Sequence, residues 1–374
     1  MISPATLFIP VTSWLSSIEK SSSPDIDKLR LVGRPILAAR WFLSSQGFLN
    51  LHSDEFDHQL FVENKSRWMR WKDGIKEIFD FLAASKYPCI LLKGVDLSQS
   101  LYPDEGIRSL GDIDLLVKPK DILPIVNLLV EKGYKISSHE KPETFKLWSS
   151  QEDTLPNEIS LFNPGGLHIE LHQHLVSSNI FQAGYPLKLD LIWERSKEID
   201  TWNCHSKFLR VLSTSDYVTY LILHIANHGF GLLAIQSFLD LDLMIRDRMD
   251  YGDWEKVKIN IVDWRLSTAA NFVLTFCKHY LDTPIPNNFI DELPVNAWSR
   301  LLLSLIIQPE HLLTGEPSLG MKYPTFAKIA AVERFTDQVI IFFKVLFPER
   351  KTLKKQSGML SHWRKIFQAI SRGD

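Results

Sequence analysis

The amino-acid sequence predicts an α+β protein, with a small core of strands and helices flanked by N-terminal helices and a larger C-terminal helical region. Three observations lead to this class. Apolar residues recur at three- and four-residue spacing between residues 27 and 85, and long helical patterns return from Ser213 onward. Between them, residues 86–176 alternate short apolar runs with a helical pattern. Hydrophobic periodicity is the main sequence indicator of secondary structure.

The N-terminal helical stretches are DKLRLVGRPILAARWFLSSQG and SRWMRWKDGIKEIFDFLAASKY. The pattern then changes at YPCILLKGVDL, where residues 89–92 form a short apolar run that ends at Lys93-Gly94. Residues 111–117 predict a second strand. The stretch PKDILPIVNLLVEKGYKI predicts a helix with Gly133 near its C-terminal cap.

Residues 158–175 predict two strands joined by the turn Asn163-Pro164-Gly165-Gly166. The helical stretches that follow include DYVTYLILHIANHGFGLLAIQSFLDLDLMIRD and AKIAAVERFTDQVIIFFKVLF. We therefore expect four segments. They are an N-terminal helical region (1–85), a catalytic domain (86–204), a C-terminal helical domain (205–348) and a basic amphipathic tail (349–374).

Composition narrows the functional class. Apolar residues make up 45% of the chain and charged residues 23%, as in an ordinary globular protein, and the net charge of -2 gives no reason to expect nucleic-acid binding. The three cysteines are far apart, which argues against disulfides and a cysteine zinc site. The N-terminus lacks the features of a signal peptide, and no apolar run is long enough to span a membrane. We therefore expect a cytoplasmic protein.

The stretch RSLGDIDLLV places two aspartates on a predicted strand. Asp112 and Asp114 are two residues apart, so they project from the same face, where their charges repel each other. Glu170 in GLHIELHQHL occupies the polar face of another predicted strand. Three carboxylates on neighbouring strands suit Mg²⁺, which prefers hard oxygen ligands and accepts nucleotide phosphates as further ligands.

These stretches resemble a known family. LLKG, then LYPDEGIRSLGDIDLLV, then LHIELH is similar to the uncharacterised nucleotidyltransferases called NTP-transferase type 5, within the polymerase-beta-like superfamily. The resemblance is specific from residue 90 to 117, moderate around Glu170 and weaker over 213–286. It implies a nucleotidyltransferase core built on a short mixed sheet with helices packed beside it.

The resemblance also implies roles. Asp112, Asp114 and Glu170 would be catalytic and would ligate Mg²⁺, or alternatively Mn²⁺, with Glu170 helping to deprotonate an acceptor hydroxyl. Residues that would bind the nucleotide are Lys93, Gly94 and Arg108. This chain departs from the wider superfamily, which usually has Gly-Ser or Gly-Gly in place of Lys93-Gly94-Val95. Glu158 on the adjoining predicted strand is an alternative third carboxylate.

Several histidines have more than one interpretation. His168, Glu170 and His172 could form a zinc site only with ligands from another strand, whereas His172 could instead orient Glu170. His224 and His228 share one helix face, and either contact substrate or have a structural role. Asp240 lies in an apolar helix, and the same two alternatives apply to it.

The tail has a separate electrostatic character. Residues 350–372 contain seven Lys or Arg and no acidic residue. One helical face would carry the apolar residues Met359, Trp363, Ile366, Phe367 and Ile370. Such a basic amphipathic helix packs on the protein's own body, or binds an acidic protein partner, a membrane surface or nucleic acid.

The resulting hypothesis is a Mg²⁺-dependent nucleotidyltransferase that moves an NMP from an NTP to a hydroxyl group. The resemblance implies a small-molecule or peptide acceptor, because members often accompany natural-product or modified-peptide pathways. The alternatives are phosphoryl transfer at the same metal site, and a non-catalytic nucleotide- or peptide-binding protein that retains the fold.

Overall fold

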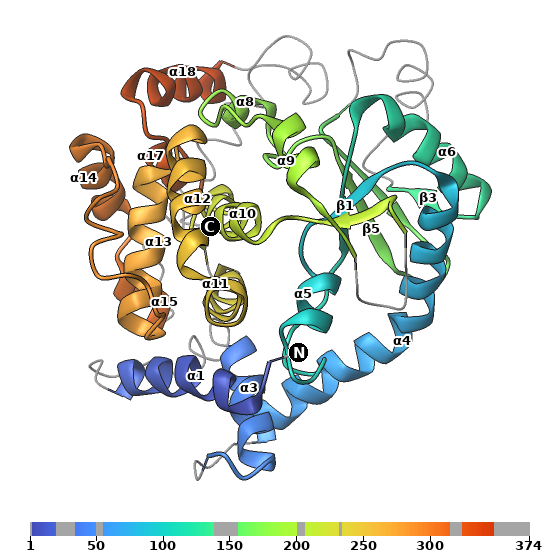
Figure 1. Ribbon diagram of the computed structural model, residues 1–374, viewed down its shortest axis with the longest axis horizontal. Helices are drawn as coiled ribbons and strands as arrows, with labels where there is room; N and C mark the ends of the chain where they lie inside the picture. The colour runs from blue at the N-terminus through green and yellow to red at the C-terminus, as the bar shows by residue number, and fades with distance from the viewer. Residues whose placement is uncertain are drawn as a thin grey trace. The chain divides into compact units, whose positions relative to one another are not determined.

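The fold is α+β, as predicted (Figure 1). The computed structural model describes most of the chain, and the tail segment expected at 349–374 lies outside the described residues. The chain divides into two compact units, of which one is built around a sheet and the other is helical in its described part. The described residues are 2–19, 34–49, 55–137, 156–199, 206–231, 234–314 and 324–347.

The first unit comprises residues 1–4, 37–177 and 188–217 and contains a mixed sheet. Within the described residues the sheet has seven strands in the order β3-β4-β5-β2-β1-β7-β6. The β1–β7 and β2–β5 pairs are parallel, and the other pairs are antiparallel. The strands are β1 (Cys89–Leu91), β2 (Ile113–Val117), β3 (Lys135–Ile136), β4 (Glu158–Phe162), β5 (His168–His172), β6 (Lys197–Glu198) and β7 (Leu209–Val211).

One face of the sheet is apolar because every second residue of its strands is aliphatic. Two helices, α4 (Glu55–Ser85) and α6 (Ile122–Glu131), bury their apolar sides against this face. Their buried residues join the strand residues in one core, with Ile75 on α4 and Leu115 on β2 fully inaccessible. Alternation with a period of two leaves the polar residues of β2, β4 and β5 on the opposite face.

The turns explain two of the predicted boundaries. Gly133 adopts a positive φ of 89° after α6, and the N–H of Tyr134 donates to the carbonyl of Leu129, which closes the helix. In the β4–β5 hairpin, the N–H of Asn163 donates to the carbonyl of Leu167, and the Asn163 side chain accepts from the Leu167 N–H. The predicted helix end and hairpin are both confirmed.

Strand β7 was not predicted, and it pairs with β1 in the interior of the sheet. Its three residues follow position 204, so the sheet uses residues beyond the catalytic segment expected from the sequence. Strand β7 was missed because a three-residue strand is too short to show a periodic pattern.

The shorter helices of this unit are α5 (Val95–Ser100), α9 (Leu189–Arg195) and the 3-10 helix Pro119–Asp121.

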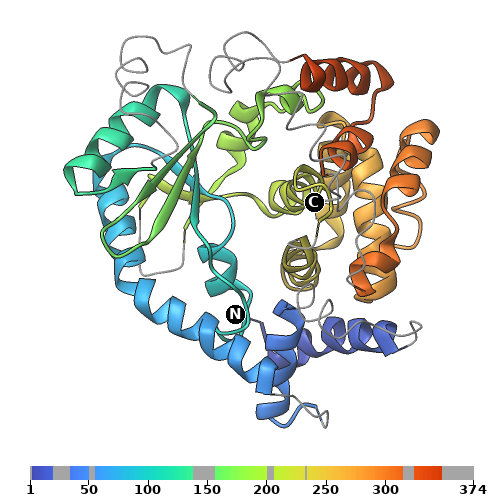
Figure 2. The same ribbon diagram turned by 180° about the vertical axis from the view of Figure 1, so that it is seen from behind.

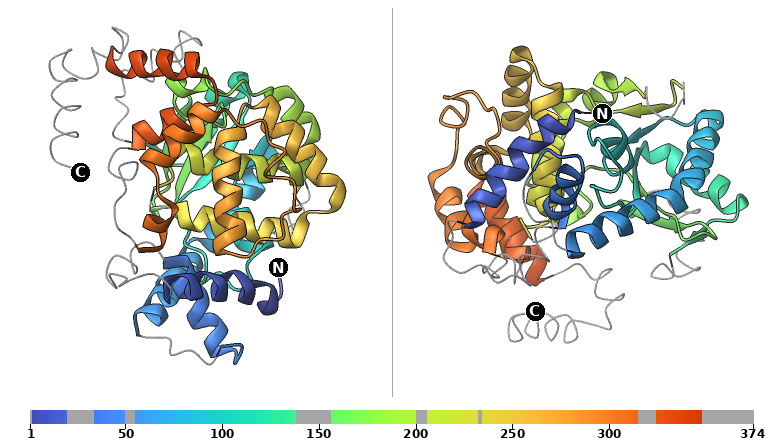
Figure 3. Two further views of the ribbon diagram at one scale, coloured as in Figure 1. Left: turned by 90° about the vertical axis from the view of Figure 1, so that its left-hand side faces the viewer. Right: turned by 90° about the horizontal axis from the view of Figure 1, so that it is seen from below.

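The second unit comprises residues 5–36, 178–187 and 218–374, and its described part is helical (Figures 2 and 3). Helices with residues in this unit include α1 (Pro4–Glu19), α3 (Arg34–Ser45) and α10 (Thr214–Asn227). In the described part of the chain, no helix has the length and apolar character needed to cross a membrane. The remaining helices are α8 (Asn179–Gln182), α11 (Ala234–Arg248), α12 (Tyr251–Asp263), α13 (Ser267–Tyr280), α14 (Ala297–Ile306), α15 (Pro309–Thr314), α17 (Pro324–Ala331) and α18 (Phe335–Leu346).

Candidate active site

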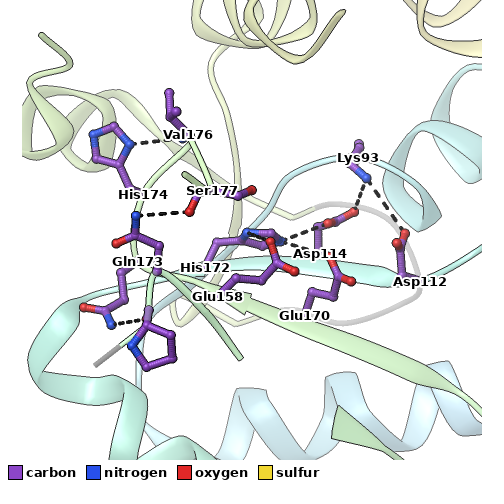
Figure 4. Close-up of polar contacts among 12 residues, drawn as sticks. Lys93, Asp112, Asp114, Glu158, Glu170, His172, Gln173, His174, Val176 and Ser177 are labelled. Atoms are coloured by element: carbon purple, nitrogen blue, oxygen red, sulfur yellow. Dashed lines mark hydrogen bonds and ion pairs between the residues drawn. The ribbon is translucent and has the colours of Figure 1, made fainter. Parts of the chain in front are cut away.

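Asp112 directly precedes β2 and Asp114 is the second residue of this strand, as Figure 4 shows for their side chains. Lys93, just after β1, reaches both of them. Its Nζ lies 2.7 Å from Oδ2 of Asp114 and 3.8 Å from Oδ1 of Asp112. Asp114 is only 2% exposed, whereas Asp112 is 29% exposed. An ammonium group between the carboxylates therefore relieves the repulsion expected from the sequence.

Strand β5 brings Glu170 to the same place. It runs parallel to β2 with Glu170 beside Asp114, and period-two alternation puts the histidines of β5 on the same face. Two groups of ligand atoms result, each within 4.8 Å: one from Asp112, His168 and Glu170, the other from Asp114, Glu170 and His172. Glu170 belongs to both groups.

The donor atoms of these groups fit a divalent cation. Carboxylate oxygens suit Mg²⁺, and a mixture of carboxylate and imidazole also suits Mn²⁺ and other first-row ions. The same atoms line a partly buried face, where an isolated set of negative charges would be costly. The structure thus contains a cluster that could hold a divalent metal ion.

The ionisable side chains at this site have pKa values shifted in different directions. Burial and the neighbouring charge of Asp114 raise the pKa of Asp112 to about 6. Burial also opposes ionisation of Asp114, but the charge of Lys93 and the hydrogen bond from His172 hold the pKa of Asp114 well below its ordinary value. Although burial opposes protonation of His172, its hydrogen bonds to Asp114 and Glu170 raise its pKa to about 9.

His172 links the active-site carboxylates to the neighbouring strand. Its Nε2 lies 3.0 Å from Oδ1 of Asp114 and 3.5 Å from Oε2 of Glu170. Its Nδ1 lies 3.7 Å from Oε2 of Glu158 on β4. Glu158 contacts His172 but belongs to neither group of candidate metal ligands. Among the described residues, Glu170 and not Glu158 therefore lies with the candidate metal ligands.

The other histidines of this segment differ in their surroundings. His168 stacks on Phe162 of β4 with ring centroids 4.3 Å apart, and its Nε2 lies 3.5 Å from Oε1 of Glu170. His174 follows the end of β5, and its Nδ1 accepts from the N–H of Val176 (Figure 4). Strict alternation over 168–174 would have included His174, but the strand ends at His172.

Gly94 permits the chain after β1 to pass close to the start of β2. Its φ is +64°, a conformation that L side chains rarely adopt, and an added Cβ would lie 3.2 Å from the carbonyl oxygen of Asp112. Gly94 precedes α5 and follows Lys93, so it helps to direct Lys93 toward the aspartates. The sequence identified this position without showing why glycine is needed there.

Arg108 lies in the turn before β2 and is 4% exposed. Its guanidinium donates to the carbonyl of Ser109 at 3.3 Å. Arg67 on α4, which the sequence did not single out, donates to the carbonyl of Leu110 at 3.1 Å. Both arginines thus support the backbone that leads to Asp112, and phosphate binding by Arg108 stays a prediction.

The remaining predicted residues lie in the second unit. His224 lies on α10 and His228 directly after its end, and their rings are 4.3 Å apart. His224 also contacts the ring of Tyr220. His228 is exposed. Asp240 on α11 is buried. A role for these three residues in substrate binding stays a prediction.

The chain is similar to a known protein family. A family described as uncharacterised nucleotidyltransferases matches residues 55–282, which include the whole site described above. No curated protein matches the sequence.

Proposed function

Because the chain belongs to the family of uncharacterised nucleotidyltransferases, we propose that it is a Mg²⁺-dependent enzyme that transfers an NMP from an NTP to a hydroxyl group. The acceptor would be a small molecule or a peptide. The observation that carries the proposal is the convergence of Asp112, Asp114 and Glu170 from two adjacent parallel strands. A degenerate binding protein would have no need to retain all three carboxylates beside one another.

The bond changes are those of a displacement at the α-phosphorus. The acceptor oxygen forms a bond to this phosphorus, the bond to the bridging oxygen of the β-phosphate breaks, and pyrophosphate leaves with its electron pair. Glu170 accepts the proton of the acceptor hydroxyl. The protein contributes mainly by positioning the reactants and neutralising charge.

Asp112, Asp114 and Glu170 would hold the metal ion, which when bound supplies positive charge beside the phosphates and the acceptor oxygen. Lys93 and Arg108 neutralise the triphosphate, and Gly94 keeps the backbone open where the phosphates approach. His172 keeps the Asp114 carboxylate oriented through the 3.0 Å contact. Imidazole in this position fixes a carboxylate as second-sphere partners do in metal sites.

The test is to incubate the protein with Mg²⁺, cell extract and each NTP, labelled in turn at the α- or the γ-phosphate. We expect label from the α-phosphate to appear in the acceptor with release of pyrophosphate. The Asp112→Asn and Asp114→Asn variants should be inactive while remaining folded, and Asp80→Asn on the exposed side of α4 serves as the matched control.

Other outcomes would contradict the proposal in different ways. Transfer of the γ-label would show a phosphoryl transferase. Metal-dependent NTP binding without transfer of either label would indicate a non-catalytic binding protein. Full activity of either active-site aspartate variant would refute the assignment of the metal site.

A further inference from the structure

The side chain of Lys93 occupies the position between Asp112 and Asp114. Lys93 Nζ lies 2.7 Å from Asp114 and 3.8 Å from Asp112, and the lysine side chain is only 17% exposed. A divalent ion held by both carboxylates would bind oxygen atoms of the same two side chains that this ammonium contacts. Two cations cannot share these atoms at close range, because their repulsion in a partly buried site is strong.

From this geometry we infer that Lys93 is an exchangeable internal cation, which leaves the aspartates when metal binds and pairs with the triphosphate instead. The inference rests on the proposed function in one respect, namely that the aspartates hold the metal ion. Lysine suits such an exchange because its charge sits at the end of a flexible four-carbon chain. The residue thus has one partner before substrate binds and another afterwards.

The exchange has a thermodynamic consequence. Metal that binds alone must displace Lys93 and leave the ammonium without its carboxylate partners. When an NTP is also present, the displaced ammonium gains the phosphates. The two ligands therefore bind cooperatively, and part of their coupling free energy comes from Lys93. A coupling of this kind usually changes affinity by about 5- to 150-fold.

A lysine that only binds phosphate would behave differently. Its removal would weaken NTP binding to the same extent with and without metal, so the enhancement of NTP binding by metal would stay unchanged. A lysine with only a structural role would alter the stability of the fold and neither affinity selectively. Exchange predicts that removing Lys93 makes metal alone bind more tightly and also reduces the enhancement of NTP binding by metal, a combination that neither of the other roles produces.

The experiment compares the full-length wild-type protein with Lys93→Met. The affinity for Mn²⁺ alone is measured from the electron paramagnetic resonance signal of the free ion. The affinities for α,β-methylene analogues of ATP, GTP, CTP and UTP are measured in EDTA and at saturating Mn²⁺. We expect Lys93→Met to bind Mn²⁺ about tenfold more tightly, and the enhancement of analogue binding by Mn²⁺ to fall by about the same factor.

Three further variants control the result. Lys93→Arg keeps a cation at the position and should retain the wild-type affinity for Mn²⁺. Lys93→Gln removes the charge but keeps a polar end, so it replaces Lys93→Met if methionine prevents folding. Lys65→Met removes another lysine between two acidic residues, since Lys65 lies 2.8 Å from Asp104 and 2.7 Å from Glu105, and should leave Mn²⁺ affinity unchanged.

The outcomes separate this inference from the proposed function. Equal or weaker Mn²⁺ binding by Lys93→Met and Lys93→Gln, in proteins that bind the metal, overturns the exchange and leaves the metal site standing. Absence of Mn²⁺ binding in every variant, with and without analogue, overturns both. Tighter binding in Lys65→Met as well would show a general effect of charge and would also overturn the exchange.

Discussion

Two aspartates that are equivalent in the sequence have different surroundings in the structure. Asp114 is buried and lies close to two cationic partners, Lys93 and His172. Asp112 is more exposed, lies farther from Lys93, and is repelled by Asp114. The same charge is therefore stabilised at one position and opposed at the other.

Replacing these residues should change stability in opposite directions. In EDTA at pH 7.5, Asp112→Asn should stabilise the fold by about 1–2 kcal/mol, because a carboxylate with a raised pKa is lost. Asp114→Asn should destabilise it by about 2–4 kcal/mol, because two cations lose their buried partner. Urea denaturation measures both changes.

The gain from Asp112→Asn should depend on pH. The folded wild-type protein holds the Asp112 proton more tightly than the unfolded chain, with a pKa of about 6, so wild-type stability falls as the pH rises from about 4 to 6. Asp112→Asn lacks this carboxylate and does not lose stability in this way. The difference in unfolding free energy between the variant and the wild type should therefore shrink as the pH falls towards 4. An equal gain at all pH values, or a gain in Asp114→Asn, would contradict this account. Asp80→Asn, at an exposed ion pair, should change stability by less than about 0.5 kcal/mol.

At the scale of elements, the site depends on the short connection between β1 and α5. β1 and β2 are antiparallel, so the end of β1 lies beside the start of β2. The N–H of Leu92 donates to the carbonyl of Asp114, which holds the two strand ends together. Gly94 then passes close to the carbonyl of Asp112. This short connection is what places Lys93 beside the aspartates.

Gly94→Ala should therefore lower the stability of the fold and weaken metal binding at the site. The alanine would be strained at a φ of +64° and would press on the Asp112 carbonyl, so we expect a loss of about 2–3 kcal/mol and weaker Mn²⁺ binding. Gly133→Ala is the matched control, because Gly133 has a φ of +89° with nothing within 4 Å of an added Cβ. Its loss should be about 1 kcal/mol, with Mn²⁺ binding unchanged. Denaturation and metal titration test both variants, and equal effects would contradict the close-approach argument.

At the scale of the whole molecule, the candidate site belongs to one unit. Every residue of the carboxylate cluster, together with Lys93 and His172, lies in the unit that contains the sheet. The matched family region, residues 55–282, includes this cluster and ends well before the basic tail. NTP binding and the function of the tail are therefore separable in principle.

Deleting residues 350–374 should leave metal-dependent NTP binding within about twofold of wild type. The same deletion should weaken binding of the acceptor or of an acidic partner, because it removes seven positive charges. The second effect should diminish at high salt, where electrostatic attraction is screened. Equilibrium binding at low and high ionic strength measures both. Loss of NTP binding in a folded truncation would show that the tail contributes to the active site.

Local sequence patterns determined much of the fold. Period-two alternation put Asp112 and Asp114 on one face of β2, and Gly133 and the turn at 163–166 marked a helix end and a hairpin. These features depend on residues within a few positions of one another, so one sequence is enough to predict them. The polar strand face that carries Glu170 also allowed its approach to the aspartates to be anticipated, whereas its role as the third carboxylate came from the family resemblance.

Only the tertiary structure decided which distant residues meet. The parallel pairing of β2 with β5 sets Glu170 beside Asp114, and β7 pairs with β1 although its three residues carry no periodic pattern. The partners of Lys93 and His172 depend on the same pairings. Hydrogen bonding and burial between segments far apart in the chain select these contacts, and local propensity carries no information about them.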